Sequence, residues 1–468
     1  MKLKIVAALL IFSSLNVFSQ STNKLREIIG SAYLENKSYN LLERLCDEAG
    51  GRVIGSEVNE KAMSIMKDEL KNIGYEAKFE KFSIPGWVRG NDQVIMKTPT
   101  ERKLQAVALG YVNKTPAFKA NVVYAKYGLE ENYKKLNVND KIVLVTQEAP
   151  PGKEQLLRYQ ILDIAAKHGA KAILYINDRS GFLNLAGMGN FQGNATKIPA
   201  FSLTFEEGKW LERLIERNMP VTIEIATNSY CKEINSANII ATLEGKVKSK
   251  IVIGAHFDSW DLGQGAVDNG VGTAILFDVA RLLKSFSPNN YYSIEFVWFN
   301  GEEFGLWGSK KYVEMHKQDS IISMINMDMT GTPTGFNVMG FDEFIPFFEN
   351  VKNQLNGFNL NSGVISSPGT NSDHMYFMFD GIPTFEIQAH LDESMYRFYH
   401  ERGDTFDKVN EKYLSDASAV ISVLVEQLSN AVKLNFKRKT SHEMVELFKH
   451  YELDKRLKNQ GEWIYKEN

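Results

Sequence analysis

Apolar runs of strand length alternate with amphipathic helical patterns through the second half of the chain. YSIEFVWF (292–299) and IISMINMDM (321–329) are strand-like, whereas VGTAILFDVARLLKSF (271–286) has helical spacing. Strands joined by helices pair in parallel, and the helices then cover both faces of the sheet. The sequence therefore predicts an α/β fold with a mixed, mainly parallel sheet flanked by helices.

A second, self-contained alternation lies between residues 117 and 227. KIVLV (141–145) and KAILYI (171–176) are strand-like, and QILDIAAKHG and EEGKWLERLIERN are helical. We predict that 117–227 forms a separate domain, inserted into a main domain made of 20–116 and 228–435.

The first residues have the pattern of a targeting segment. Lys2 and Lys4 precede an apolar run that ends at Val17, and small residues follow at Ser19. This pattern predicts a secretory signal peptide over 1–19 and a secreted or periplasmic protein.

The last residues, 436–468, have a charged helical pattern. We expect this tail to be a solvated surface element or a contact in a homodimer. The chain has two cysteines, Cys46 and Cys231, and their separation in sequence leaves open whether they pair or remain free thiols.

Charge and hydropathy exclude some classes of partner. The 54 Lys and Arg residues against 57 Asp and Glu residues give a net charge of −3. No stretch after the signal segment is long and apolar enough to cross a bilayer. The sequence therefore predicts neither a nucleic-acid partner nor a membrane partner after signal cleavage.

Histidine and acidic residues follow the predicted strands of the main domain. His256 follows one strand, Glu302 and Glu303 follow the next, and Asp328 lies at the end of a third. Ligand sites in open α/β sheets lie at the carboxyl ends of the strands. An aspartate in an apolar strand carries a desolvation cost unless it is paired or bound to metal. This edge of the sheet is therefore a candidate metal site.

Zinc in a catalytic site binds imidazole nitrogens and carboxylate oxygens and keeps one position open. The candidate ligands are His256, Asp268, Glu303, Asp328 and His400. They are too many for one tetrahedral ion. If Asp268 bridges, two Zn²⁺ ions per chain each have one histidine, one terminal carboxylate and the shared aspartate. Such a pair polarises a carbonyl and generates hydroxide from water at neutral pH.

Three further residues have expected roles beside the ligands. Asp258 lies two residues after His256 on the same face of an extended segment, so it can accept the second N–H of the imidazole. The side chains of Glu302 and Glu303 diverge. We assign Glu303 to the metal and Glu302 to the general base that later protonates the leaving amine. Tyr399, next to His400, is a candidate to stabilise the oxyanion.

Several of these motifs also occur without a metal. A His-x-Asp pair is common, adjacent glutamates usually begin a solvated helix, and His400 could be an ordinary loop histidine. His374 competes with His400 as the second imidazole, and His390 is a weaker competitor.

Four segments carry a family resemblance: HFDSWDLGQGAVDNG (256–270), NGEEFGLWGS (300–309), NMD (326–328) and YHERGDT (399–405). They resemble the metal motifs of the M28 family of co-catalytic zinc aminopeptidases and carboxypeptidases. The similarity reaches back to GGRVIGSEVNEKAM and IPGWVRG, and it covers most of the chain to about residue 435. It implies the zinc-peptidase fold with an inserted domain similar to a protease-associated domain.

The resemblance also implies how the ligands are shared. It places His256, Asp268 and Asp328 on one zinc, and Glu303, Asp268 and His400 on the other, with Glu302 as base and Asp258 behind the ligands. It favours His400 over His374 because the family ligand stands four residues before an Asp-Thr pair, here Asp404-Thr405. It further implies a cis peptide between Asp268 and Asn269, where relatives often have a second acid.

The expected activity is hydrolysis of dipeptides or short peptides by a metal-bound hydroxide. Aminopeptidase action on longer peptides is an alternative. A non-catalytic binding ectodomain on the same fold is a third, disfavoured because all five ligands and Glu302 are present. An acyl-transfer or cyclising enzyme would be expected to use a single zinc.

Overall fold

The computed structural model describes residues 23–153 and 155–466, and its strands form two sheets of eight. The first sheet has the strand order β1-β10-β12-β11-β13-β16-β14-β15, and its four central strands, β12, β11, β13 and β16, run parallel to one another. Its strands are β1 (Lys78–Val88), β10 (Tyr230–Leu243), β11 (Val247–His256), β12 (Tyr292–Phe299), β13 (Ile321–Asn326), β14 (Thr332–Asn337), β15 (Gly363–Ile365) and β16 (Thr384–His390). The predicted signal peptide lies outside the described residues.

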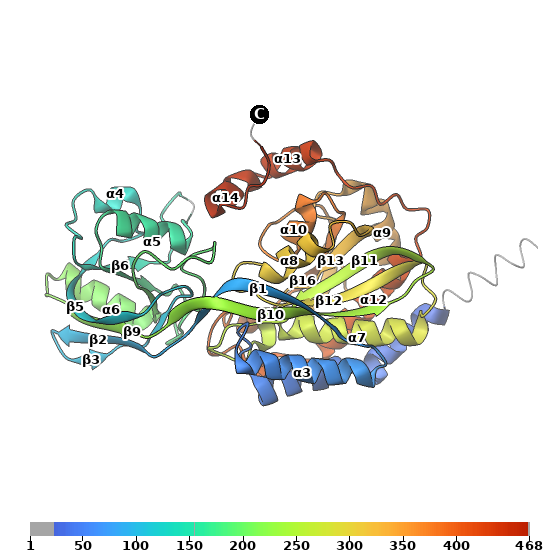
Figure 1. The fold of residues 1–468 in the computed structure, drawn as a ribbon, viewed down its shortest axis with the longest axis horizontal. Coiled ribbons are helices and arrows are strands. Elements are labelled where there is room, and N and C mark those ends of the chain that lie inside the picture. Colours follow the sequence, from blue (N-terminus) through green and yellow to red (C-terminus); the bar gives the residue numbers. More distant parts are fainter. Residues whose placement is uncertain (1–22, 154, 467–468) are drawn as a thin grey trace, which may run out of the picture.

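Helices cover both faces of this sheet (Figure 1). Ile251 and Ile253 of β11 belong to the core beneath α7, whereas Val252 between them packs on the opposite face with Tyr312 of α8. Successive strand residues point to opposite faces, so these apolar runs supply two cores at once. The helices are α2 (Ser38–Arg44), α3 (Glu57–Asn72), α7 (Val271–Phe286), α8 (Trp307–Met315), α9 (Ile345–Gln354), α10 (His374–Phe379), α11 (Glu393–Tyr396) and α12 (Glu411–Ser429). The predicted α/β fold is confirmed, with antiparallel strands at the edges of the sheet.

The second sheet builds the inserted domain and has the order β3-β2-β9-β5-β6-β7-β8-β4. Its elements are β2 (Asp92–Thr98), β3 (Arg102–Lys103), β4 (Ala106–Ala108), β5 (Thr115–Tyr124), α4 (Glu130–Tyr133), β6 (Ile142–Thr146), α5 (Arg158–Lys167), β7 (Ala172–Ile176), β8 (Ala200–Leu203), α6 (Phe205–Glu216) and β9 (Thr222–Thr227). Strands β2 to β4 precede the expected start of this domain at residue 117. They join its sheet because Val94 and Met96 of β2 point into the same core as β9.

Two long antiparallel strands, β1 and β10, lead from the first sheet to the inserted domain (Figure 1). Where the chain passes between the domains, Gly90 lies against the backbone of Asn228. A Cβ at Gly90 would stand 2.5 Å from the carbonyl carbon of Asn228, so only glycine permits this close passage.

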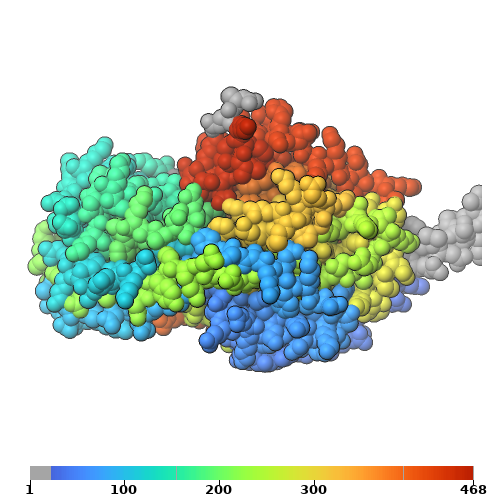
Figure 2. Space-filling view, in the orientation of Figure 1, coloured from blue at the N-terminus to red at the C-terminus, as the bar shows by residue number. Residues whose placement is uncertain are grey.

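The C-terminal tail forms α13 (Ser441–His450) and α14 (Leu453–Gln460). Met444, Phe448 and Leu457 are fully buried, and the ring of Phe448 lies edge-on to Phe379 of α10. Figure 2 shows the tail meeting the inserted domain on one face of the molecule. The tail is therefore a packed part of the protein that reaches both domains.

Two further expectations concern the whole chain. Cys46 and Cys231 are free thiols, one buried in the core and one half-buried on β10. Among the described helices, none has the length and apolar character to span a membrane.

Candidate metal centre

One cluster of ligand atoms lies where β11 and β13 end. His256 is the last residue of β11, Asp328 follows β13, and Asp268 lies in the turn Ala266–Gly270 before α7. The Nε2 atom of His256 is 3.1 Å from Oδ1 of Asp268 and 3.3 Å from Oδ1 of Asp328. Neighbouring parallel strands bring their carboxyl ends to one edge, which is why residues far apart in sequence meet here.

A second cluster shares Asp268 with the first. The Nε2 atom of His400 is 3.0 Å from Oδ2 of Asp268 and 2.9 Å from Oε2 of Glu303, which follows β12. Each cluster places three potential ligand atoms within 4.8 Å of one another. The two oxygens of Asp268 thus face different histidines, and this one carboxylate joins both clusters.

The clusters are buried and rich in negative charge. His256, Asp268 and Glu303 are 1%, 4% and 5% exposed, and in the described chain their ion-pair partners are one another, Asp258, Asp328 and His400. Burial together with the Asp268 carboxylate raises the pKa of Glu303 to about 7, although His400 opposes this. Burial and the carboxyls of Asp328 and Glu303 raise the pKa of Glu302 well above its usual value.

These residues fit a pair of divalent cations. Three carboxylates are crowded without a lysine or arginine partner among the described residues, and Oε1 of Glu303 is buried without a hydrogen bond. Buried carboxylates carry a large desolvation cost unless positive charge compensates them. Imidazole and carboxylate donors are the set that zinc prefers in catalytic sites.

Asp258 is placed differently from the expectation. Its carboxylate oxygen Oδ1 is 3.9 Å from Nδ1 of His256, and this nitrogen instead lies 3.1 Å from the backbone carbonyl of Asp258. The carboxylate accepts the backbone N–H groups of Gly301, Glu302 and Glu303, at 2.7, 3.1 and 3.3 Å. Asp258 therefore still stands behind the ligands, but its side chain orients the loop that carries both glutamates.

The competing histidines lie outside both clusters. His374 is fully buried at the start of α10, with Nδ1 3.0 Å from Glu386 and Nε2 3.1 Å from the carbonyl of Gly369. His390 has a 69% exposed side chain beside Asp392. Of the three candidates, His400 alone belongs to a cluster.

Asp404 and Arg52 support the Asp268 turn, and this role was not predicted from the sequence. Asp404 accepts the N–H groups of Val267 and Asp268 at 2.7 and 3.2 Å. The fully buried Arg52 donates to the carbonyls of Phe257, Gln264 and Gly265. Asp404 stood in the YHERGDT motif and Arg52 in the GGRV segment, so a buried-charge interpretation of these motifs would have identified them. The peptide between Asp268 and Asn269 is cis, as the resemblance implied.

Substitution of Asp404 tests this support. Asp404→Ala removes the acceptor of two buried N–H groups, and we expect the zinc-free protein to lose about 1–3 kcal/mol of unfolding free energy. Urea unfolding with a chelator present measures the loss. Asp404→Asn keeps one acceptor oxygen and serves as the control. Equal unfolding free energies of the wild type and Asp404→Ala would show that Asp404 does not support the Asp268 turn.

The inserted domain holds the segment that carries His400. The N–H of Ala186 donates to the carbonyl of His400 at 3.0 Å, and Nη1 of Arg179 donates to the carbonyl of Tyr399 at 2.9 Å. The amide of Asn177 donates to Oε1 of Glu401 at 2.8 Å. Local sequence patterns do not predict these three contacts, because each of them joins segments about 220 residues apart.

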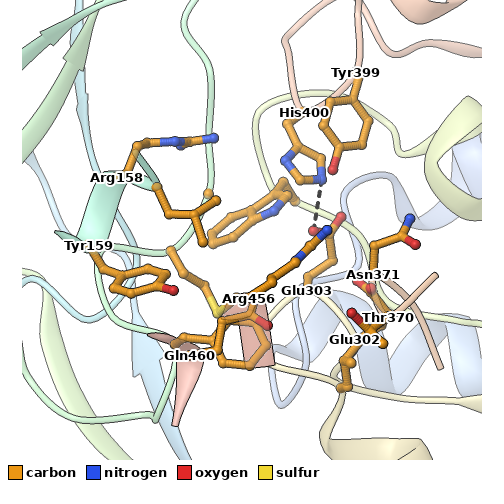
Figure 3. Close-up of a pocket in the computed structure, with 16 residues that line it drawn as sticks. Arg158, Tyr159, Glu302, Glu303, Thr370, Asn371, Tyr399, His400, Arg456 and Gln460 are labelled. Atoms are coloured by element: carbon orange, nitrogen blue, oxygen red, sulfur yellow. Dashed lines mark ion pairs between the residues drawn. The ribbon is translucent and has the colours of Figure 1, made fainter. Parts of the chain in front are cut away.

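A pocket of about 210 Å³ opens beside the second cluster (Figure 3). Glu302, Glu303 and His400 line it, and the ring of Tyr399 stacks on His400 with centroids 3.7 Å apart. A second cavity of about 420 Å³ is lined by Asp268, Glu302, Asp328 and Tyr399. Glu302 and Tyr399 border both spaces, so a bound molecule in either one lies next to them.

Comparisons with known proteins agree with this geometry. Residues 238–425 match the family model described as Peptidase family M28, and residues 111–211 match that of the PA domain. Carboxypeptidase Q of Mus musculus is 29% identical over 404 residues, which cover 83% of this chain and 85% of that protein. Aminopeptidase YwaD of Bacillus subtilis (strain 168) is 24% identical, with 90% and 89% covered.

The fold has solved counterparts. A structure titled Peptidase M28 precursor from Shewanella amazonensis SB2B superposes with a TM-score of 0.78 and 24% identity, over 90% of this chain and 99% of that one. The chain therefore contains a peptidase family M28 domain over residues 238–425 and a PA domain over residues 111–211 ahead of it, and it is a metallopeptidase.

Proposed function

We propose that the protein is a secreted zinc exopeptidase that uses two Zn²⁺ ions to hydrolyse dipeptides or short peptides. The observation that carries the proposal is the position of Asp268, whose two oxygens face His256 and His400 at 3.1 and 3.0 Å. A carboxylate so placed suits a bridging ligand. The carboxypeptidase and aminopeptidase relatives support exopeptidase chemistry.

Each ion has three protein ligands in this proposal. His256, Asp268 and Asp328 would hold one, and Asp268, Glu303 and His400 would hold the other. The chemistry that zinc supplies in such a site is polarisation of a carbonyl and activation of water at neutral pH.

Glu302 acts as the general base. Its carboxylate takes a proton from the attacking water and returns it to the leaving nitrogen as the C–N bond breaks. Glu302 borders both cavities beside the ligands, and its backbone N–H is held by Asp258, so its side chain is aimed at the space where the peptide bond would lie.

Tyr399 stabilises the oxyanion. Its ring is fixed against His400, and its hydroxyl points into the pocket in Figure 3. A donor fixed before the reaction stabilises developing charge more than one that must reorganise.

The pocket favours a short substrate. Its volume of about 210 Å³ is below the roughly 300–1,000 Å³ that is common for small-molecule sites, and the cavity of about 420 Å³ that shares Glu302 and Tyr399 with it lies in the lower part of this range. The inserted domain closes one side through Arg158, Tyr159 and Met188.

Paired substrates test this function. We expect the zinc-loaded protein to hydrolyse a dipeptide at least about 100-fold faster than the same dipeptide extended by three residues at its carboxyl end. Mass spectrometry of both reactions gives the rates. Removal of the first residue of the longer peptide at a similar rate would instead indicate aminopeptidase activity. If the zinc-loaded protein hydrolysed neither peptide, the proposed function would be wrong.

A further inference from the structure

The C-terminal tail contributes to the wall of the catalytic pocket. Arg456 and Gln460 of α14 line it together with Glu302, Glu303 and His400. Both lie beyond residue 425, where the match to the peptidase family model ends. Figure 3 shows the Arg456 side chain extending from α14 across the pocket.

The tail is fixed at this place. The hydroxyl of Tyr376 on α10 donates to Oε2 of Glu462 at 2.8 Å, and the hydroxyl of Tyr465 donates to the carbonyl of Phe379 at 3.0 Å. At the other side, Gly461 lies so close to Gln192 of the inserted domain that a Cβ at Gly461 would stand 2.0 Å from Nε2 of Gln192. Contacts on both sides hold α14 over the pocket.

Two guanidinium groups in the pocket, those of Arg158 and Arg456, form no ion pair with an acidic residue in the described part of the chain. Within residues 23–153 and 155–466, Arg456 forms no hydrogen bond or ion pair, and Arg158 has one hydrogen bond, from Nη1 to the carbonyl of Ala186 at 3.1 Å. Guanidinium groups bind carboxylates through paired, charge-assisted hydrogen bonds. The pocket therefore presents positive charge to an anion from outside the chain.

Buried polar atoms without a partner converge on the same pocket. Gln460 is 5% exposed, and its Oε1 has no hydrogen bond among the described residues. The same holds for the hydroxyl of Tyr159, Nε1 of Trp260 and Oγ1 of Thr370, which also line the pocket. Unpaired buried polar atoms are uncommon in native proteins. Their convergence from three parts of the chain points to a polar ligand.

We propose that α14 is a specificity element in which Arg456 binds the free α-carboxylate of a dipeptide and Gln460 hydrogen-bonds its backbone. The inference rests on the proposed hydrolysis at the neighbouring metal clusters. A dipeptide carries an ammonium, one amide and one carboxylate within a short span, and the lining of this pocket offers carboxylates together with the guanidinium groups of Arg158 and Arg456 to its charged ends. A longer peptide has no carboxylate at the Arg456 position.

The test compares a dipeptide with the same dipeptide carrying a C-terminal carboxamide. For Arg456→Gln we expect kcat/KM for the free acid to fall by about 10–100-fold, the range for a lost charge-assisted hydrogen bond, and kcat/KM for the carboxamide to stay within about twofold. Arg456→Lys keeps the charge without the planar fork and should fall between. Lys455→Gln removes the same charge from the adjacent residue of α14, outside the pocket lining, and should change neither rate.

Binding provides a readout without turnover. Calorimetry in the Glu302→Gln background measures Kd for the dipeptide and for its carboxamide. Arg456→Gln should weaken binding of the free acid by the same factor, about 10–100-fold, and leave binding of the carboxamide unchanged. Equal losses for acid and carboxamide, or no loss for either, would overturn the role of Arg456. Selective loss of binding in this background, together with zinc-loaded wild-type protein that hydrolyses neither ligand, would support the carboxylate site and reject the hydrolysis.

Discussion

Glu302→Gln is expected to lower kcat for a dipeptide by about 10²–10⁴-fold, the usual contribution of a positioned general base. Glutamine keeps the size of the side chain but cannot accept the proton of the attacking water. Glu302 belongs to neither ligand cluster, so both zinc equivalents should remain bound. Steady-state rates and elemental analysis of the same sample measure the two quantities.

The control for this variant is Glu314→Gln on α8. Glu314 pairs with Lys311 at 2.8 Å on the surface, so its loss should leave kcat and zinc content unchanged. If Glu302→Gln retained more than about a tenth of the wild-type kcat, Glu302 would not be the base. If it lost zinc, the division of roles between Glu302 and Glu303 would be wrong.

Asp268→Asn is expected to weaken zinc binding by more than about 100-fold and to abolish turnover. Loss of a residue that hydrogen-bonds to a metal ligand costs about 10–100-fold in metal affinity. Asp268 is itself a candidate ligand and is shared by both clusters, so its substitution should cost more. The amide can offer one oxygen, whereas the carboxylate faces His256 and His400 with two. Zinc titration into the metal-free protein measures the affinity and the number of sites.

Asp261→Asn is a matched control in the same loop. Its carboxylate pairs with Nε of Arg89 at 2.6 Å and contacts neither cluster, so zinc affinity should be unchanged. Two zinc sites of wild-type affinity in Asp268→Asn would contradict the bridging role. A circular dichroism melt of each variant separates loss of ligand from loss of fold.

The fold and the position of the site follow from local patterns. The apolar runs of β11, β12 and β13 define parallel strands, and parallel strands place their carboxyl ends together. His256 ends β11, and Glu303 and Asp328 lie shortly after the ends of β12 and β13, so the strand pattern alone brings all three to one edge. His400 follows no central strand of this kind, and it was assigned through the family resemblance.

Contacts between distant segments were not predictable in the same way. Asp258 could satisfy either an imidazole or backbone N–H groups, and the choice depends on how the 301–303 turn folds back, which periodicity does not encode. The tail has a charged helical pattern, which is typical of a solvated surface. Its position over the pocket depends on a few buried side chains such as Phe448 and Leu457.

The contacts from Asn177, Arg179 and Ala186 to the His400 segment tie one candidate metal ligand to the inserted domain. His256 and Asp328 are supplied by the peptidase sheet itself, whereas His400 stands on a segment fastened from the other domain. The geometry of the cluster that contains His400 therefore depends on contacts from the inserted domain, whereas the cluster that contains His256 and Asp328 depends on the peptidase sheet.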